Sequence, residues 1–498
     1  RKSLAEARPF LGKNLKNCVW VGGGECLYSH PSRAQAQTQS QKESIVMTVK
    51  VAVVGGGVTG MMAAISAAEC GAKVTLYEKN PILGKRLLML ETEDFAYTHG
   101  GDVEQLVEGF SRGGEFLYPA LSRFSNQAWI GYLEKLGLKP ISVEDRFLPE
   151  TGKPEDLVNL LSDELKKRGV EVKISTKIQD LLLSRKKIQG LVAHNLEAKY
   201  DRVILTTGGL ARPKTGSTGD GLSFAEKLRH NIIPTFPGLV PLKTLEKLGN
   251  ELPGAVLKKV KLTLFVDKER QESVFGKVKF VSGAIAGPTI LAMSGKVNRL
   301  LSESKSVEIS LDLKPDTPRE HLEEWFKAEA EKGLNVSVGD LLHTFIPGRM
   351  IPVVGRFSGA RVYKGYFALS SLEKKALLIV VKDMRFNITG SGSYQDALVT
   401  SGGVDLSEVD IDTMESKLVK GLYFAGEILD IEGKTGAYNL QATFSTARTA
   451  GEAAGKAPKR AAKRKVSVKK AAASKKAKSV TRKVAAPKKA AATQPDSS

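Results

Sequence analysis

The stretch Lys50-Val-Ala-Val-Val-Gly-Gly-Gly-Val-Thr-Gly60 decides the fold that this sequence predicts. Its first part, Val51 to Val54, is apolar without alternation, which is typical of a strand buried on both faces of a parallel sheet. Gly55, Gly57 and Gly60 follow in the G-x-G-x-x-G spacing. In this motif the glycines permit a tight turn, a close approach of the backbone to a pyrophosphate, and close packing of helix on strand.

The residues after the glycines complete a βαβ unit. Residues 58–70 are rich in Ala and Met and predict a helix, and Gly71 stands where a helix C′ residue is expected. A second predicted strand, 73–78, ends at Glu78, 18 residues past Gly60. A carboxylate there can accept hydrogen bonds from ribose hydroxyls, whereas it would repel a 2′-phosphate. The pattern predicts a dinucleotide-binding unit; a glycine turn in some other βαβ unit is the alternative.

Composition bounds the class of protein. The chain has 498 residues, of which 42% are hydrophobic, enough for two or three domains with sizeable cores. No run of about 18 apolar residues predicts a membrane span. The three cysteines, Cys18, Cys26 and Cys70, show no metal-ligand spacing and no disulfide pattern, so we expect a reducing, cytoplasmic location and no metal site.

The formal charge of +21 is concentrated at the ends of the chain. Residues 456–498 contribute +14 and residues 1–46 contribute +4, which leaves only +3 for residues 47–455. The body is therefore nearly neutral. The first segment is basic and contains serines, so it fits either an organellar transit peptide or a translated leader before a domain that starts at Met47.

Changes in composition and hydrophobic pattern along the chain predict the order of the domains. Residues 1–46 are a leader or disordered segment, and residues 47–235 and 386–455 have α/β character. Residues 236–385, with alternating strands such as 259–266 and 306–313 and an amphipathic helix over 318–332, predict an inserted mixed β/α substrate or cap domain. Residues 456–498, low-complexity and rich in Lys and Ala, are expected to be disordered because they have almost no large apolar side chains to bury.

The second α/β part contains a buried strand closed by Gly426 and Glu427, after which Gly436 to Gln441 open a helix of small residues. A helix N-terminus presents unpaired N–H groups and a partial positive charge, which suit an electron-rich oxygen or an anionic flavin ring.

From about Met47 to Gly455 the chain resembles the BaiN/YhiN-type, aminoacetone-oxidase-like family of FAD-dependent flavoproteins. Blocks that carry the resemblance are 53–60, 205–221, 238–242, 282–291, 399–404, 413–417, 421–430 and 436–441; the blocks 213–221 and 413–441 are the most specific. The resemblance implies a two-dinucleotide-binding, Rossmann-like FAD domain interrupted by a smaller insert. It implies an FAD-dependent oxidoreductase that moves a hydride equivalent between a small organic substrate and the flavin.

The resemblance also assigns cofactor contacts, position by position. Gly55, Gly57 and Gly60 would contact the pyrophosphate and Glu78 the adenosine ribose. The remaining implied FAD contacts are Lys79, Gly84, Lys85, Ile178, Thr207, Gly208, Gly209, Gly426, Glu427, Asn439, Leu440 and Gln441.

One segment departs from the family pattern. Where the family has a glycine-rich Ser-Gly-Gly-Gly-Arg-Cys-Asn run beside the flavin, this chain has Met89 to His99, which is acidic and lacks the glycines and the cysteine. A carboxylate-rich loop cannot give the same close backbone approach. The departure implies a remodelled pocket, or altered or lost catalysis.

Candidates for chemistry are few, because the cofactor itself carries flavin chemistry. Tyr438, beside the expected flavin edge, is a proton donor or a buried structural tyrosine. His99 is an acid/base group or an exposed loop histidine. Lys214 and Thr215 are candidates for a substrate or phosphate contact, and for Asp220 a helix cap is the simpler interpretation. No separate nicotinamide fingerprint is present, but NAD(P)H could still bind transiently over the flavin.

The tail supports a second hypothesis. Its paired lysines and arginines over 456–489 resemble linker-histone tails and could bind nucleic acid or another polyanion without sequence preference; a solvated tail with no partner is the alternative. The protein would then be DNA-associated, or a catalytically weak flavin-binding protein tethered to nucleic acid.

Overall fold

The computed structural model describes residues 48–90, 95–246, 252–333 and 336–457, and these form one compact unit. The expectations for the leader 1–46 and for nearly all of the tail 456–498 lie outside the described residues.

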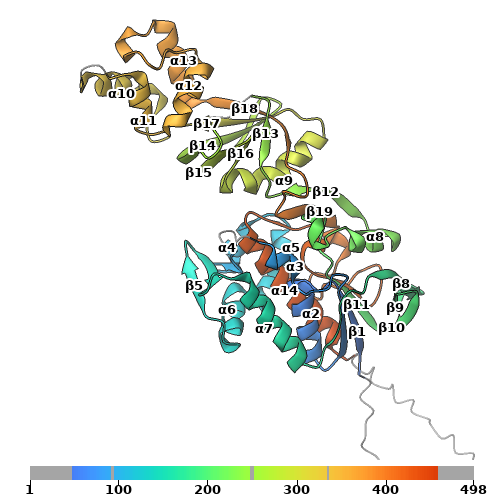
Figure 1. The fold of residues 1–498 in the computed structure, drawn as a ribbon. Helices are drawn as coiled ribbons and strands as arrows, with labels where there is room; N and C mark the ends of the chain where they lie inside the picture. Colours follow the sequence, from blue (N-terminus) through green and yellow to red (C-terminus); the bar gives the residue numbers. More distant parts are fainter. Residues whose placement is uncertain (1–47, 91–94, 247–251, 334–335, 458–498) are drawn as a thin grey trace, which may run out of the picture. The chain divides into compact units, whose positions relative to one another are not determined.

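A five-stranded parallel sheet, built from strands near both ends of the described chain, organises the first domain (Figure 1). Its order is β20-β11-β1-β2-β7, with bounds Leu422–Phe424, Arg202–Leu205, Lys50–Val54, Lys73–Tyr77 and Glu171–Lys173. The central strand β1 is buried from Val51 to Val54, as expected from its unbroken apolar run. Val54 pairs with both Tyr77 and Leu205, so the turns after β1, β2 and β11 leave the sheet at one edge. The predicted βαβ unit is confirmed.

Helices cover one side of this sheet, and a three-stranded meander lies on the other (Figure 1). The covering helices are α2 (Val58–Glu69), α7 (Pro154–Lys167) and α14 (Gly436–Gly455); the meander is β8 (Ile178–Ser184), β9 (Lys187–Ala193) and β10 (Leu196–Lys199). Gly451 and Gly455 of α14 lie directly against the carbonyl oxygens of Ala63 and Ala67 in α2. Any side chain at these two glycines would separate the helices, so glycine sets their close approach.

Smaller elements complete the domain. Short strands are β3 (Thr98–His99), β4 (Phe110–Arg112), β5 (Pro140–Val143), β6 (Arg146–Pro149) and β21 (Glu432–Gly433). Helices are α3 (Lys85–Leu88), α4 (Val103–Glu108), α5 (Gly114–Arg123), α6 (Asn126–Lys135) and α8 (Asp220–Lys227). Short 3-10 turns are η2 (Pro213–Thr215), η5 (Leu406–Glu408) and η6 (Gly426–Ile428).

The insert contains a closed six-stranded barrel, ordered β13-β16-β15-β14-β17-β18. The strands are Leu242–Thr244, Ala284–Ala286, Glu269–Val281, Val256–Val266, Val307–Asp312 and Met384–Ser391. The helices of the insert are α9 (Pro288–Ser302), α10 (Arg319–Glu331), α11 (Val338–His343), α12 (Ile351–Ser358) and α13 (Ser371–Lys382), with η3 (Gly348–Met350) and η4 (Tyr366–Ala368). The insert has its own hydrophobic core, which includes Leu262, Phe280 and Phe386. Because β18 runs to Ser391, the boundary expected after residue 385 falls inside a barrel strand.

Two neighbouring strands connect the insert to the rest of the chain. β12 (Ile232–Gly238) leads toward the barrel and β19 (Val399–Val404) returns from it, and they pair antiparallel, with a bulge between Ile233 and Phe236. The chain therefore leaves and re-enters the domain of the parallel sheet at one place. Within the described ranges, no helix is long and apolar enough to cross a membrane.

Candidate functional site

The glycine turn after β1 leaves a helix end open toward a cavity. Gly55 has φ of 110° and packs on the carbonyl group of Thr206, and Gly60 packs on the carbonyl oxygen of Gly55. Gly57 caps α2 without any side-chain hydrogen bond, and the first turn of α2 holds no acidic residue. A Cβ atom on Gly57 would meet no protein atom within 4 Å. The first N–H groups of α2 therefore face open space, as an anion site requires.

Glu78 closes this turn from the end of β2. Its Oε2 accepts a hydrogen bond from the backbone N–H of Gly56 at 2.6 Å. Its Oε1 accepts from the backbone N–H and from the side-chain amide of Asn80, each at 2.7 Å. The carboxylate is buried and fixed beside the glycine turn. It is placed as the acidic residue of a dinucleotide site should be, with lone pairs left over for ribose hydroxyls.

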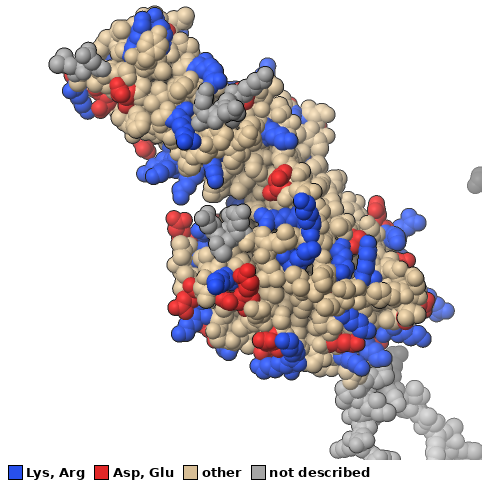
Figure 2. Space-filling view, in the orientation of Figure 1, with Lys and Arg blue, Asp and Glu red and all other residues tan. Residues whose placement is uncertain are grey.

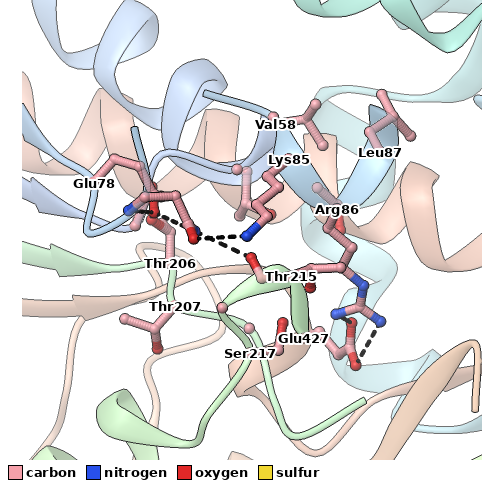
Figure 3. Close-up of a pocket in the computed structure, with 18 of the residues that line it drawn as sticks. Val58, Glu78, Lys85, Arg86, Leu87, Thr206, Thr207, Thr215, Ser217 and Glu427 are labelled. Carbon is pink, nitrogen blue, oxygen red and sulfur yellow. Dashed lines mark hydrogen bonds and ion pairs between the residues drawn. The ribbon is translucent and has the colours of Figure 1, made fainter. Parts of the chain in front are cut away.

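One cavity joins the glycine turn to the start of α14 (Figure 3). Of the cofactor contacts expected from the sequence, the following line it: Gly55, Gly57, Glu78, Lys79, Gly84, Lys85, Ile178, Thr207, Gly208, Glu427, Asn439 and Leu440. Thr215, a substrate or phosphate candidate, lines it as well. Segments more than 300 residues apart in the chain thus face a single space.

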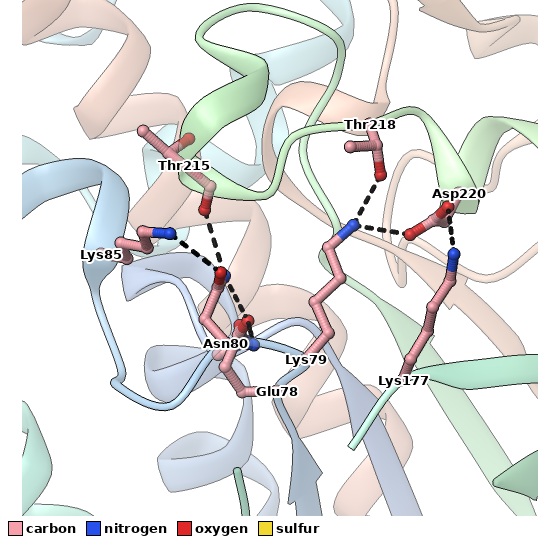
Figure 4. A network of polar contacts seen from close by, with 9 residues as sticks. Glu78, Lys79, Asn80, Lys85, Lys177, Thr215, Thr218 and Asp220 are labelled. Carbon is pink, nitrogen blue, oxygen red and sulfur yellow. Dashed lines mark hydrogen bonds and ion pairs between the residues drawn. The ribbon is translucent and has the colours of Figure 1, made fainter. Parts of the chain in front are cut away.

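A polar network borders the cavity beside Glu78 (Figure 4). The Nζ atom of Lys79 donates to Asp220 and to Thr218, each at 2.6 Å, and Lys177 lies 3.5 Å from Asp220. Burial opposes ionisation of Asp220, but the hydrogen bond and charge of Lys79 outweigh it and hold the pKa of Asp220 below its ordinary value. Asp220 is the first residue of α8, but the N-cap is Gly219 and no side chain caps the helix, so the expected capping role of Asp220 is wrong. Its carboxylate pairs with Lys79 and Lys177 instead.

Arg86 and Glu427 form an ion pair at the other end of the residues drawn in Figure 3. Nη1 of Arg86 lies 2.6 Å from Oε2 of Glu427, and Nη2 donates to the carbonyl of Leu398 at 2.7 Å. Oε1 of Glu427 accepts from the backbone N–H of Thr400 at 2.7 Å. The pair joins α3, η6 and β19. Sequence reasoning missed Arg86 and Asn80, because neither belongs to a motif with fixed spacing.

Seven expected site residues do not line the cavity: His99 and Tyr438, described below, and five others. Gly60, Gly209 and Gly426 pack against Gly55, Thr400 and Thr59, respectively, and Lys214 is exposed on η2. Gln441 is fully buried: its amide donates to the carbonyl of Phe124 at 3.1 Å and to Ser445 at 2.9 Å, and its oxygen accepts from Thr98 at 2.6 Å. Its polar atoms are thus engaged by protein groups behind the cavity wall.

The two catalytic candidates, His99 and Tyr438, are in contact. Their rings stack with centroids 4.6 Å apart and planes 14° from parallel. His99 ends both β3 and the segment 89–99 that departs from the family pattern, of which residues 91–94 lie outside the described residues. Tyr438 lies in the first turn of α14, directly before the cavity-lining Asn439 and Leu440. Burial, and to a lesser degree the charge of Asp145, raise the pKa of the Tyr438 hydroxyl above its ordinary value.

The residues present fit FAD. The open end of α2 suits its pyrophosphate and Glu78 suits its ribose. Among the described residues, the Oγ1 atom of Thr207, which lines the cavity after β11, is buried without a hydrogen-bond partner, and so is that of Thr435, the N-cap of α14. Such orphaned polar atoms are expected where a polar ligand binds. Among the residues that the structure describes, no group of three or more His, Cys, Asp or Glu could hold a metal ion.

This parallel sheet, glycine turn and buried carboxylate define a dinucleotide-binding protein with an inserted domain. Comparison with known families agrees: the model described as HI0933-like protein Rossmann domain matches residues 49–453. The chain belongs to this family, as the resemblance noted in the sequence indicated, and it is an FAD-dependent oxidoreductase.

Relatives of known activity cover most of the chain. A 3-dehydro-bile acid delta(4,6)-reductase of Clostridium scindens is 28% identical over 422 residues, which is 82% of this chain and all of the relative. A ribosomal RNA dihydrouridine synthase of Escherichia coli is 26% identical over 407 residues, 79% of this chain and 95% of the relative. A protein of the same description from Haemophilus influenzae is 26% identical over 401 residues, 79% of this chain and 96% of the relative. These matches favour an oxidoreductase over a catalytically weak flavin-binding protein.

Proposed function

We propose that this protein reduces a carbon–carbon double bond that is conjugated to a carbonyl group. The names of its relatives share this chemistry. A 3-dehydro-bile acid has a ketone in conjugation with its reducible double bonds, and dihydrouridine is uridine reduced at the ring double bond next to a carbonyl group. Such a reduction adds a hydride to one carbon and a proton to the other.

FAD, when bound, supplies the two-electron, hydride-type chemistry. The protein must then hold the cofactor, orient the substrate and deliver one proton. Glu78 and the N-terminus of α2 would hold the adenosine half. Arg86, Glu427 and the residues at the start of α14 would border the other half. NAD(P)H is the proposed reductant of the flavin, bound transiently within the same cavity.

The stacked pair of His99 and Tyr438 is the observation that carries this proposal. The phenol of Tyr438 is protonated at neutral pH, as that of an ordinary tyrosine is, so it holds a proton that it can donate. Within the described chain the hydroxyl of Tyr438 has no hydrogen-bond partner, so its proton is free for a substrate carbon. The imidazole of His99 holds the phenol ring by stacking. We therefore assign proton donation to Tyr438 and a positioning role to His99.

The test separates the two half-reactions. Flavin absorbance is followed anaerobically, first on addition of NADH or NADPH and then on addition of a 4-en-3-one steroid or a uridine-containing RNA. We expect Tyr438→Phe to slow reoxidation of the flavin by the active substrate about 10²- to 10⁴-fold, the usual contribution of a general acid. Reduction by the nicotinamide should not change.

Tyr118→Phe is the matched control, because Tyr118 is an exposed tyrosine on α5. It should behave as wild type in both half-reactions. Equal reoxidation rates for Tyr438→Phe and wild type would refute the role of Tyr438. A protein whose reduced flavin is reoxidised by neither class of conjugated substrate would refute the proposed reaction.

A further inference from the structure

The outer face of the barrel carries a surface that the reaction does not use. We call it the lysine–phenylalanine surface and define it as Lys258, Lys259 and Lys261 of β14 with Phe275, Lys277 and Lys279 of β15. Lys261 is half-buried and the other five side chains are exposed. Figure 2 shows Lys and Arg gathered over these two strands.

The sequence places these side chains outward through alternation and one irregularity. In β14, Leu257, Val260, Leu262 and Leu264 point into the barrel core, so the residues between them face out. A β-bulge between Leu257 and Val260 adds one residue to the strand, and two consecutive lysines, Lys258 and Lys259, are exposed as a result. Lys277 of β15 lies opposite this bulge, between the partners of Val260 and Leu257.

The lysines of the surface form no ion pair within the described chain, whereas several other cations of the insert do. Lys296 pairs with Glu272 at 2.7 Å, Lys305 with Asp267 at 3.0 Å, and Lys382 with Asp312 at 2.7 Å. Asp312 lies opposite Lys261 in the sheet, but Lys382 engages it. In the described part of the chain none of the five surface lysines has an ion pair. Within the described chain, five cations on two adjacent strands therefore form no ion pair.

An aromatic ring lies among these cations. Phe275 is 69% exposed, and it pairs with Lys261, whose Nζ lies 5.9 Å from the centre of the ring. Positive charges beside an exposed aromatic face are what a single-stranded nucleic acid binds, because its phosphates require cations and its unpaired bases stack on aromatic rings. Lysines two residues apart on a strand are about 7 Å apart, so they can follow a backbone of successive phosphates.

We infer that the lysine–phenylalanine surface binds single-stranded RNA, with its phosphates on the lysines and one base on Phe275. The choice of RNA rests on the proposed function, since uridine in RNA is one of the two substrate classes considered there. An anionic membrane fits less well, because the surface has one large aromatic side chain and no apolar belt to enter lipid. The barrel would then hold the RNA chain while the FAD-binding domain acts on a base.

Phe275→Trp in the full chain gives a direct readout, because it places a fluorophore at the proposed stacking position. Addition of a twelve-nucleotide oligouridylate should quench the emission of the tryptophan at position 275. Tyr118→Trp, at an exposed position of the FAD-binding domain, is the matched control and should not respond. RNA binding without quenching at position 275 would overturn the proposal, because the RNA would then bind elsewhere on the chain. Equal quenching by vesicles of phosphatidylserine would also overturn it.

Charge reversal tests the lysines. K258E/K259E should weaken RNA binding at least about tenfold and lower the slope of log affinity against log salt by roughly 1.4, or about 0.7 for each lost phosphate contact. The charge-matched control is K166E/K167E, a consecutive lysine pair on α7. Equal loss in both double variants would indicate a general effect of net charge and contradict a specific surface.

The closing experiment separates this inference from the proposed function. Phe275→Ala should raise the Kd for oligouridylate about 5- to 100-fold, the usual effect of losing one stacked base. Reoxidation of the reduced flavin by a small free enone should stay at the wild-type rate, since Phe275 lies outside the cavity. Unchanged RNA affinity would refute the surface alone, whereas absent reoxidation by every conjugated substrate would refute the reaction alone.

Discussion

Of the positions in the glycine turn, Gly57 is the one where a substitution should affect cofactor binding with the least effect on folding. Its φ of −70° suits any residue, and an added Cβ would meet no protein atom within 4 Å. Gly57→Ala should therefore change the free energy of unfolding of the FAD-free protein by no more than about 1 kcal/mol. The new methyl group points into the cavity, where the pyrophosphate must approach the backbone.

Gly57→Ala should instead weaken the binding of FAD. If the methyl group displaces the pyrophosphate from one N–H group of α2, the loss is about 1.5–3 kcal/mol for a hydrogen bond to a charged group. This corresponds to a rise in the Kd for FAD of about 10- to 100-fold. FAD-free protein is titrated with FAD while flavin fluorescence is followed, and thermal unfolding is measured without FAD.

Two other glycines serve as controls. Gly131→Ala, in helix α6 with open space around it, should leave FAD binding unchanged. Gly60→Ala would press a methyl group onto the carbonyl oxygen of Gly55 and should lower the Tm of the FAD-free protein as well. The reasoning fails if Gly57→Ala binds FAD within threefold of wild type, or if it lowers this Tm as much as Gly60→Ala does.

Three groups give pH-dependent predictions, each tested by Tm measured against pH: Asp220, which is half-buried, and His230 and Glu432, which are buried. The pKa of Asp220 is lowered in the folded state, so the Asp220 carboxylate stabilises the fold above about pH 4 and this stabilisation is lost at lower pH. Asp220→Asn should therefore have a lower Tm than wild type near neutral pH, and the difference should shrink below about pH 4. Burial lowers the pKa of His230, so wild type should lose Tm as pH falls below about 6.5, and His230→Gln should lose less across that range. Burial raises the pKa of Glu432, so ionisation of this carboxyl group destabilises the fold as pH rises. The Tm of Glu432→Gln should therefore increase relative to that of wild type as pH rises. A Tm difference that does not change with pH would contradict the prediction.

The part of the fold that the sequence predicts well is the part set by local pattern. The strand at 51–54, the helix at 58–70 and the strand at 73–78 correspond to β1, α2 and β2 within one residue at nearly every end. Here the glycine spacing, the apolar run and the helix propensity all favour one conformation. The barrel is harder to predict from the sequence. Two of its strands and α10 show clear periodicity, but closure depends on pairing between β13 and β18, about 140 residues apart.

The site likewise contains residues that local sequence pattern predicts and residues that only the tertiary fold brings together. Glu78 is predictable because its distance from the glycines is fixed by one helix and one strand. Arg86 is not, since its partner Glu427 is 341 residues away and only the tertiary fold brings them together. Gln441 illustrates the opposite case: it belongs to a family block at the start of α14, but its position on the helix turns it toward Phe124 and Ser445. The contact between His99 and Tyr438 likewise had no signal in the sequence.

The pairing of β12 with β19 has a consequence for how such proteins diverge. Because the chain crosses to the insert and back on two hydrogen-bonded neighbours, the ends of the insert lie side by side. An insert of another size or shape could be accommodated at this junction without altering the register of β1 with β2 or β11. Gene rearrangement could therefore exchange the insert while the domain of the parallel sheet is inherited intact.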